Sequence, residues 1–357
     1  MGVFSGPEIS TAGLILNIDA GNRKSWGGVG AERLGGITAV FDNWNGLVGT
    51  STLYKNTPGS QGAYLKITNA NGGGVRWWDS VNGIRPCLSS TQYVISAKVK
   101  YSGNTPNPNM FYVRQYNSGG TQTSEGGKYS SANQIDLGDG YYLTWALFTT
   151  DATAVSFLVQ GYDYANIEIW LEDVQCRLAG LADISGKGNN GSLTGSMSIL
   201  ASSGGVVQLS GNNFINTGLN LSTGSYTVIS ATRYTTTGGR IITALTNNWL
   251  MGHWGGSTEN HYAEGWVSAV SSGTSDTNWR ILAASGNTVS DSWQMYVNGV
   301  QTYSNGNGSA GPNGLGINVY ATERSSCEVG LLMVFDRVLT PEEIRQVFNA
   351  YRGRFGI

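Results

Sequence analysis

Short runs in which apolar and polar residues alternate recur along this chain, separated by Gly, Asn and Ser. In the run 93–101, for example, apolar side chains occupy every second position, with Ser96, Lys98 and Lys100 between them. A period of two predicts β-strands, because successive side chains of a strand point to opposite faces of its sheet. The pattern is repeated at 141–149, 155–160, 167–174, 226–234, 240–245, 279–283, 293–303 and 328–335. We therefore expect an all-β fold.

The composition agrees with strands joined by tight turns. Gly occurs 52 times, which is roughly double its average share. Charged residues make up 12 % of the chain, against about 25 % in typical proteins. Aromatic residues make up 11 %, which argues against a disordered chain. The pair Asn298-Gly299 lies between apolar alternations and predicts a hairpin with a type I′ turn.

One helix is predicted, near the C-terminal end of the sequence. Thr340 and Glu343 form a capping box, and Pro341 suits the first helical position. Gly353 is expected to end the helix. The apolar residues that follow the capping box are spaced to form one stripe: Ile344, Val347, Phe348 and Tyr351. We expect this short helix to pack across the edge or end of a β-sandwich.

Charge and cysteine usage exclude several classes of protein. The net charge is −2 with scattered Lys and Arg, so no basic stripe favours nucleic-acid binding. Cys87, Cys176 and Cys327 are far apart, which predicts buried thiols; a pair between Cys87 and Cys176 is the alternative. No apolar run approaches the roughly 20 residues of a membrane span. Residues 1–8 lack the basic and apolar regions of a secretory signal.

Five motifs in the second half of the chain resemble, in order, those of laminin-G-like (concanavalin A-like lectin) sandwiches in bacteriophage proteins. They are Asp183–Gly191, Ser225–Val228, His261–Trp266, Tyr296–Val300 and Glu328–Glu343. The resemblance implies a β-sandwich and a protein of the virus particle rather than an enzyme. Trp254 and Trp266 are expected in the core of this sandwich.

The first of these five motifs belongs to a longer motif that is split between two distant places in the sequence. Gly13–Asn22 resembles its first half and Leu181–Leu193 its second half, although in the phage domains the two halves follow one another closely. The separation predicts a discontinuous sandwich domain, made of residues 1–30 and 181–357, with a second domain inserted in a surface turn. The strand at 14–18 should then pair within the sandwich.

The inserted segment has its own resemblance. Residues 31–180 are similar to the carbohydrate-binding-module-like jelly rolls of phage tail and fibre proteins, on Gly140–Trp145 and Ile167–Gln175. We therefore expect two β-sandwich (jelly-roll) domains, one inserted in the other.

Glycan contact is the first binding function that the residues suggest. Trp77 and Trp78 are adjacent, so in a strand one ring could lie in the core and the other on the surface. An exposed ring beside Asp79, Arg76 and Arg114 would stack on the apolar face of a pyranose, whose hydroxyls would bind the charged groups. The alternative is that both rings pack at a domain interface.

The sequence offers little for catalysis or for a transition metal. Laminarinase-type enzymes share this sandwich and use a Glu-x-Asp-x-x-Glu pattern, whereas Glu168 and Glu172 lack the intervening Asp and belong to the insert. We predict no catalytic residue and no enzyme. His253 and His261 have two glutamates nearby, but zinc needs three or four ligands, so a hydrogen-bonded Gly-rich loop is expected.

Calcium is the one metal that the resemblance brings into question. Some laminin-G-like domains hold calcium at the rim of the sandwich through Asp and Asn oxygens, and Asp183, Asn189 and Asn190 offer such ligands. These residues account for only three of the roughly 6–8 oxygens that Ca²⁺ takes. The favoured interpretation is therefore a tight turn, with calcium as the alternative.

These observations predict a non-enzymatic bacteriophage virion protein displayed on the particle surface, as a capsid decoration (head-fibre) or tail-fibre component. The expected partners are other virion proteins of the capsid or tail and, weakly, host-surface glycans, with no nucleic acid and no membrane. We expect a homo-oligomer, a trimer or lattice-bound copies, assembled in the host cytoplasm. The alternative is a secreted lectin, or a glycan-active enzyme with a binding module.

Overall fold

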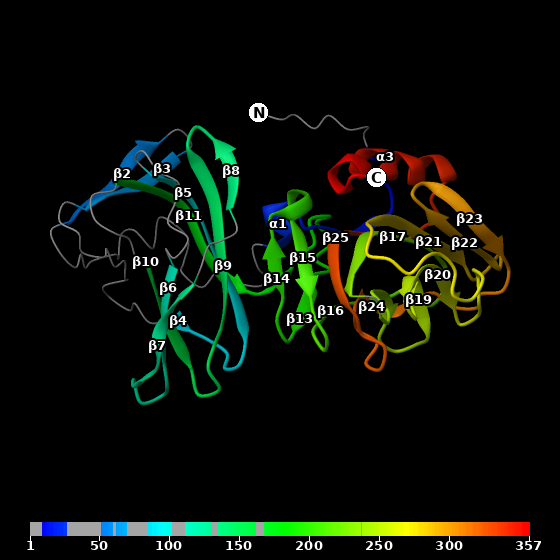
Figure 1. The fold of residues 1–357 in the computed structure, drawn as a ribbon, viewed down its shortest axis with the longest axis horizontal. Helices are drawn as coiled ribbons and strands as arrows, with labels where there is room; N and C mark the ends of the chain where they lie inside the picture. Colours follow the sequence, from blue (N-terminus) through cyan, green and yellow to red (C-terminus); the bar gives the residue numbers. More distant parts are fainter. Residues whose placement is uncertain are drawn as a thin grey trace. The chain divides into compact units, whose positions relative to one another are not determined.

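The computed structural model describes residues 9–26, 51–59, 62–69, 85–101, 111–129, 134–161, 168–236 and 238–357. Most of the regular structure in these ranges is β-strand (Figure 1), so the all-β prediction is confirmed. The chain divides into two compact units. Unit 1 contains Met1–Val29 and Gly180–Ile357, and unit 2 contains Gly30–Ala179. No helix in the described ranges is long and apolar enough to cross a membrane.

Unit 1 is built on two antiparallel sheets. In the eight-stranded sheet the order is β14 (Ser198–Leu200), β15 (Val206–Leu209), β25 (Ser326–Phe335), β17 (Ser225–Thr236), β21 (Arg280–Asn287), β22 (Ser292–Val297) and β23 (Val300–Asn305), and β1 (Leu14–Asp19) also pairs with β25. In the seven-stranded sheet the order is β12 (Gly180–Leu181), β13 (Gly191–Thr194), β16 (Phe214–Asn220), β24 (Asn313–Ile317), β18 (Ile242–Ala244), β19 (Trp249–Trp254) and β20 (Ser257–Ala263).

The N-terminal strand β1 belongs to the same sheet as the last strand of the chain. It runs antiparallel to β25, which confirms that residues 14–18 pair within the sandwich. The two halves of the split motif meet beside this pairing. The Asn17 amide donates to Asp183 Oδ1 at 2.9 Å, and the Ile184 amide donates to the Asn17 carbonyl at 2.8 Å. The short helices α1 (Arg23–Trp26) and η1 (Ser202–Gly204) complete this region.

Helix α3 (Pro341–Phe355) begins as the sequence predicts and ends later. The Thr340 hydroxyl accepts from the Glu343 amide, and the Glu343 carboxylate accepts from the Thr340 amide, which completes the capping box. The predicted end at Gly353 is wrong. The left-handed residue that ends the helix is Gly356, with φ 70°. The extra residues bring Phe355 onto Trp279, with ring centroids 4.7 Å apart.

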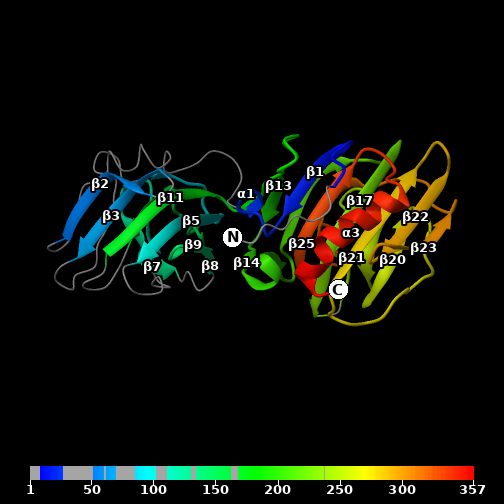
Figure 2. The same cartoon turned by 90° about the horizontal axis from the view of Figure 1, so that it is seen from above.

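The predicted position of the helix is also wrong, because α3 lies on a sheet face and not at an edge or end. Figure 2 shows α3 lying across β25, β17 and β21. The helix buries Ile344, Val347 and Phe355 against the strands. The eight-stranded sheet therefore has two apolar faces, one toward the seven-stranded sheet and one toward α3. Consecutive residues of β17 and β25 point to opposite faces of the sheet, and they are buried in unbroken runs because both faces are covered.

We expect Thr340→Ala to lower the free energy of unfolding by about 1 kcal/mol, because it removes the hydroxyl that satisfies a free backbone amide. The measurement is urea unfolding followed by tryptophan fluorescence. Thr340→Ser is the matched control, since it keeps the hydroxyl. An equal loss in both variants would show that the cap is not responsible.

Unit 2 is a second sandwich. Its six-stranded sheet has the order β2 (Ser51–Gly59), β3 (Gly62–Asn69), β11 (Glu168–Leu178), β5 (Gln92–Tyr101), β9 (Tyr141–Thr149) and β8 (Gln134–Gly138). Its four-stranded sheet has the order β4 (Arg85–Pro86), β10 (Ser156–Gly161), β6 (Phe111–Tyr116) and β7 (Gln122–Tyr129). The rings of Tyr93, Phe148 and Phe157 join the two sheets. Cys87 and Cys176 are thiols and form no disulfide.

Candidate functional site

Unit 1 contains a pocket of about 480 Å³ beside the C-terminal end of α3. Its volume lies within the roughly 300–1,000 Å³ that is usual for small-molecule sites. Strands of both sheets and the hairpin between β22 and β23 contribute to it. The lining residues are Arg233, Glu259, Thr277, Asn278, Trp279, Arg280, Asn298, Phe355, Gly356 and Ile357. Charged and amide groups thus face two aromatic rings, which favours a polar ligand that also has an apolar surface.

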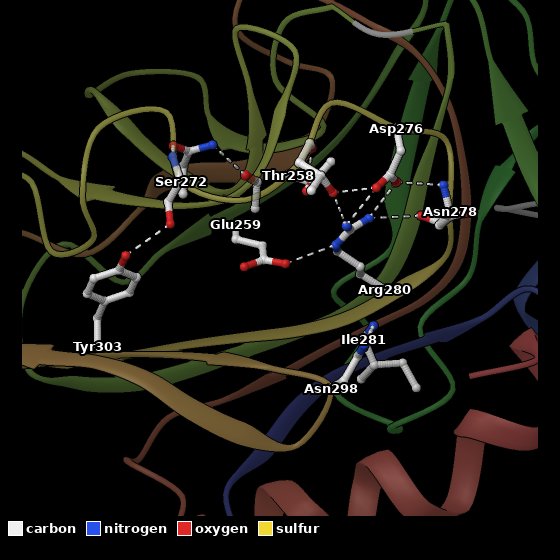
Figure 3. A network of polar contacts seen from close by, with 12 residues as sticks. Thr258, Glu259, Ser272, Asp276, Asn278, Arg280, Ile281, Asn298 and Tyr303 are labelled. Carbon is white, nitrogen blue, oxygen red and sulfur yellow. Dashed lines mark hydrogen bonds and ion pairs between the residues drawn. The ribbon is translucent and has the colours of Figure 1, made fainter.

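Arg280, the first residue of β21, holds one wall of the pocket together (Figure 3). Its two terminal nitrogens donate to the two carboxylate oxygens of Asp276 at 2.7 and 2.9 Å, and Nε donates to Glu259 at 3.3 Å. Thr274 Oγ1 and the Asn278 carbonyl accept at 2.7 and 3.5 Å. All five guanidinium N–H groups therefore have acceptors. Arg280 is a positioning residue that fixes the loop 274–278.

Arg233 of β17 brings a second guanidinium to the pocket, and one of its nitrogens is not used by the residues that the structure describes. Nε and Nη2 bind the buried Glu328 carboxylate at 2.9 and 2.8 Å, while the Arg233 side chain is 33 % exposed. The guanidinium carbon lies 5.2 Å from the centroid of Trp279, which in turn contacts Phe355. Nη1 of Arg233 has no hydrogen-bond partner among the described residues. It is therefore available to a ligand, above an aromatic wall.

Asn298 and Glu259 complete the set of polar groups. Asn298 and Gly299 have φ 50° and 78°, which confirms the predicted type I′ turn. The amide oxygen of Asn298 accepts from the Ile281 amide at 3.0 Å, and this bond leaves Nδ2 as a donor. Glu259 uses Oε1 for Arg280 and keeps Oε2 as an acceptor. The pocket therefore offers two kinds of donor and one carboxylate acceptor in fixed positions.

The two histidines lie on β19 and β20 and are fully buried. The prediction of a hydrogen-bonded Gly-rich loop is therefore wrong, because both belong to strands. His253 packs edge-to-face on Tyr234 of the opposite sheet, with centroids 4.6 Å apart. Burial, followed by the charge of Arg280, lowers the pKa of His253 to about 3. Burial also lowers the pKa of His261 to about 3. Both rings are thus neutral at physiological pH.

The glutamates near these histidines have other partners. Glu259 forms an ion pair with Arg280, and Glu264 accepts from the Asn248 amide at 2.7 Å. Within the ranges that the structure describes, no three His, Cys, Asp or Glu side chains gather into a metal site.

The calcium candidate forms a turn whose oxygens are already occupied. Asp183 Oδ1 accepts from the amides of Asn17 and Ser185, and Oδ2 accepts from the Ser185 hydroxyl and the Asn189 amide. The Asn190 side chain accepts from the Asp183 amide, and Asn189 Nδ2 donates to a carbonyl of β1. A cation would have to displace these donors, so the arrangement fits the tight-turn interpretation.

Most of the residues predicted to contact a glycan in the insert lie outside the described residues. Arg76, Trp77, Trp78 and Asp79 fall outside the described residues, and Arg114 is half-buried on β6 of unit 2. Glu168 and Glu172 lie on β11, and only their backbone is described. These candidates therefore stay predictions.

The sequence analysis missed the residues of the pocket because five separate parts of the chain contribute them: β17, β20, β21 with the loop before it, the turn between β22 and β23, and the end of α3. One signal was available. Arg280 stands between the apolar residues Trp279 and Ile281 and is preceded at i−4 by Asp276. A buried cation with a nearby carboxylate often marks an ordered polar network.

No family model matches the chain, and no curated protein matches it either. Among solved structures, it is similar to domain 4 of AbnA, a GH43 extracellular arabinanase from Geobacillus stearothermophilus, in complex with arabinotriose, at 19 % identity, 46 % coverage of this chain, 91 % coverage of that chain and TM-score 0.38. It is also similar to a xylan-binding domain from Paenibacillus barcinonensis, at 17 % identity and TM-score 0.28, over 48 % of this chain and 97 % of that chain. The enzymatically active domain of tailspike protein 4 of Bacteriophage CBA120 is similar at 13 % identity and TM-score 0.29, over 45 % of this chain and 21 % of that chain. The names of the first two neighbours state that these proteins act on or bind a glycan. TM-scores as low as these do not assign this chain to a family.

Proposed function

We propose that this chain is a non-enzymatic bacteriophage virion protein that recognises a host-surface glycan through the pocket beside α3. The observation that carries the glycan part is the combination of fixed donors, one fixed acceptor and two aromatic rings in one pocket. Hydroxyl groups of a sugar both donate and accept, so they match Arg233 and Asn298 on one side and Glu259 on the other. The C–H groups of a sugar match the parts of Trp279 and Phe355 that line the pocket, although both side chains are otherwise buried.

The charges of the pocket favour a neutral sugar over an acidic one. Arg233 is paired with Glu328, and Arg280 is paired with Asp276. The carboxylate of Glu259 then leaves the cluster with an excess of negative charge, which repels an anionic ligand. The contacts also hold these side chains in place before a ligand arrives, which reduces the entropy lost on binding.

The same contacts support binding rather than hydrolysis. Cleavage of a glycosidic bond generally uses two carboxyl groups, one of which must carry a proton. The hydrogen bonds from Arg280 hold the pKa of Asp276 well below its usual range, so Asp276 stays ionised. Among the described residues, Glu259 is then the one carboxylate side chain that lines the pocket.

The virion part of the proposal rests on the five ordered sequence motifs and on the resemblance of the insert to phage modules. It places the protein on the particle surface, at the capsid or the tail, bound to other virion proteins in several copies. Immuno-electron microscopy of purified particles, together with the mass of the protein in solution, tests this part. A monomer that is absent from particles would refute it, and the secreted lectin would become the leading alternative.

We expect Glu259→Gln to weaken glycan binding by about tenfold or more, since a charged hydrogen bond contributes roughly 1.5–3 kcal/mol. The substitution keeps the shape of the side chain but replaces the free acceptor with a donor. Glycan-array signals and titration calorimetry on the strongest hit measure the effect. Glu342→Gln, on the exposed surface of α3, is the control. Equal binding by both variants would reject the pocket as the site.

A further inference from the structure

Three aromatic side chains of unit 1 form a cluster at the edge of the seven-stranded sheet: Trp254, Tyr262 and Trp266. We name these three residues the aromatic trio. Trp266 is central, with ring centroids 5.2 Å from Trp254 and 5.1 Å from Tyr262 and interplanar angles of 61° and 73°. Each ring is partly exposed, so the prediction that Trp254 and Trp266 lie in the core is wrong. The reason for their exposure is the tight turn that follows Tyr262. Trp266 pairs with Tyr262 across this turn as an isolated antiparallel bridge, which holds its ring beside that of Tyr262.

The trio lies on the outer side of its sheet. His253 and His261 are buried and contact Tyr234 and Trp249 inside the sandwich. Tyr262 directly follows His261 in β20, so its side chain points to the opposite face. The pairing of β19 with β20 shifts register between Gly252 and Trp254, and the contact with Trp266 places Trp254 on the same side as Tyr262. Glu259, which lines the pocket, shares a face with His261, the other lining residues come from the eight-stranded sheet, its connecting segments and α3, and none of the trio lines the pocket. The trio is therefore separate from the pocket.

The polar ends of the trio remain open to solvent. The core indoles are satisfied, since Trp249 donates to the Tyr226 hydroxyl and Trp293 donates to Asp291, both at 2.9 Å. The indole nitrogens of Trp254 and Trp266 and the hydroxyl of Tyr262 have no hydrogen-bond partner among the described residues. They are also absent from the buried unpaired atoms, so they reach water.

Exposed rings with open polar edges suit a ligand that has an apolar face and hydroxyl groups. Glu264 is exposed in the turn between Tyr262 and Trp266, and it keeps one carboxylate oxygen as an acceptor beside the one that accepts from the Asn248 amide. A stable protein interface needs about 800 Å² from each partner. Three half-buried side chains offer far less, but they offer enough area for one sugar ring. A pyranose therefore fits this surface better than a protein does.

We propose that the aromatic trio is a second saccharide contact, which stacks one neutral pyranose ring on the outer face of the seven-stranded sheet. This inference rests on the proposed glycan-binding function and adds to it a separate site. Two contacts on one unit would raise the avidity for a glycan surface, since the second contact forms at a high effective concentration.

The test is an NMR titration of the indole N–H signals of the full chain with N-acetyl-D-glucosamine, methyl α-D-glucopyranoside and methyl β-D-galactopyranoside. With at least one probe, we expect the signals of Trp254 and Trp266 to shift while those of Trp249 and Trp293 stay in place. Trp254→Ala should weaken this binding about tenfold, and Trp254→Phe should weaken it by less than about threefold, because Phe keeps an aromatic face. Unchanged core indole signals verify that each variant is folded.

The outcomes separate this inference from the proposed function. Array binding that depends on Glu259, with Trp254 and Trp266 unmoved by every probe, overturns the second contact alone. Shifts at the trio together with array binding that ignores Glu259→Gln support the second contact and reject the pocket. A chain that binds no probe and no array glycan overturns both.

Discussion

Acidification from about pH 7.5 to about pH 5 should lower the free energy of unfolding by about 4 kcal/mol, which corresponds to about 2 kcal/mol for each buried histidine. His253 and His261 have pKa values of about 3 in the folded protein, against 6.5 for the free side chain. Between these values the unfolded chain binds more protons than the folded one. Stability is therefore full above the unfolded pKa and is lost as the pH falls below about 6.5.

Urea unfolding at a series of pH values measures this effect. The control is the double variant His253→Leu with His261→Leu, which should be much less sensitive to pH over the same range. Asp276 and Glu343 also have lowered pKa values, through hydrogen bonds from Arg280 and Arg337 respectively. Their ordinary pKa values are 3.8 and 4.5, so they act mainly at lower pH. A wild-type protein with constant stability down to pH 5 would show that the rings are hydrated or paired.

Arg280→Met should lower the free energy of unfolding by about 3 kcal/mol, because it leaves partly buried carboxylates without their cation. The Arg280 side chain is 10 % exposed, and those of Asp276 and Glu259 are 26 % and 27 % exposed. The loop 274–278 loses its anchor at the same time, so glycan binding should fall as well. Arg280→Lys should be intermediate, since an ammonium group cannot satisfy five acceptor positions in one plane.

Arg345→Met is the matched control for this prediction. Arg345 pairs with Glu342 on the exposed face of α3, where both side chains are more than half exposed. Such surface pairs contribute about 0–1 kcal/mol. Chemical unfolding of the two variants side by side decides the matter, and a loss in Arg280→Met no greater than that in Arg345→Met would contradict the role assigned to Arg280.

Features with a local cause could be predicted from the sequence. The period of two in the strands, the turn at Asn298-Gly299 and the capping box at Thr340 each depend on residues a few positions apart. The end of α3 could not be predicted in the same way. Gly353 and Gly356 are equally suitable by residue type, and the choice depends on the packing of Phe355 against Trp279.

The candidate site lies beyond local patterns. Arg233, Glu259, Arg280 and Asn298 come from four elements, and the sequence does not reveal which of their polar atoms remain free. The surface position of Trp254 and Trp266 could not be predicted from the sequence for a related reason. Tryptophan is usually well buried, and only the turn after β20 places these rings on the outer face.

The pairing of β1 with β25 has a consequence for the way the chain is made. Leu14 leaves the ribosome well before its partner Phe335 is synthesised, because most of the residues of both units lie between them in the sequence. At roughly 5–20 residues per second, β1 waits about a quarter of a minute to a minute for its neighbour. Unit 2 is complete by Ala179 and can fold during this wait. Unit 1 must instead wait to assemble until β25 has been synthesised, and its sheet edges are prone to aggregate until then. Slow, cool expression should therefore raise the yield of soluble protein, and chains that stop before β25 should not accumulate.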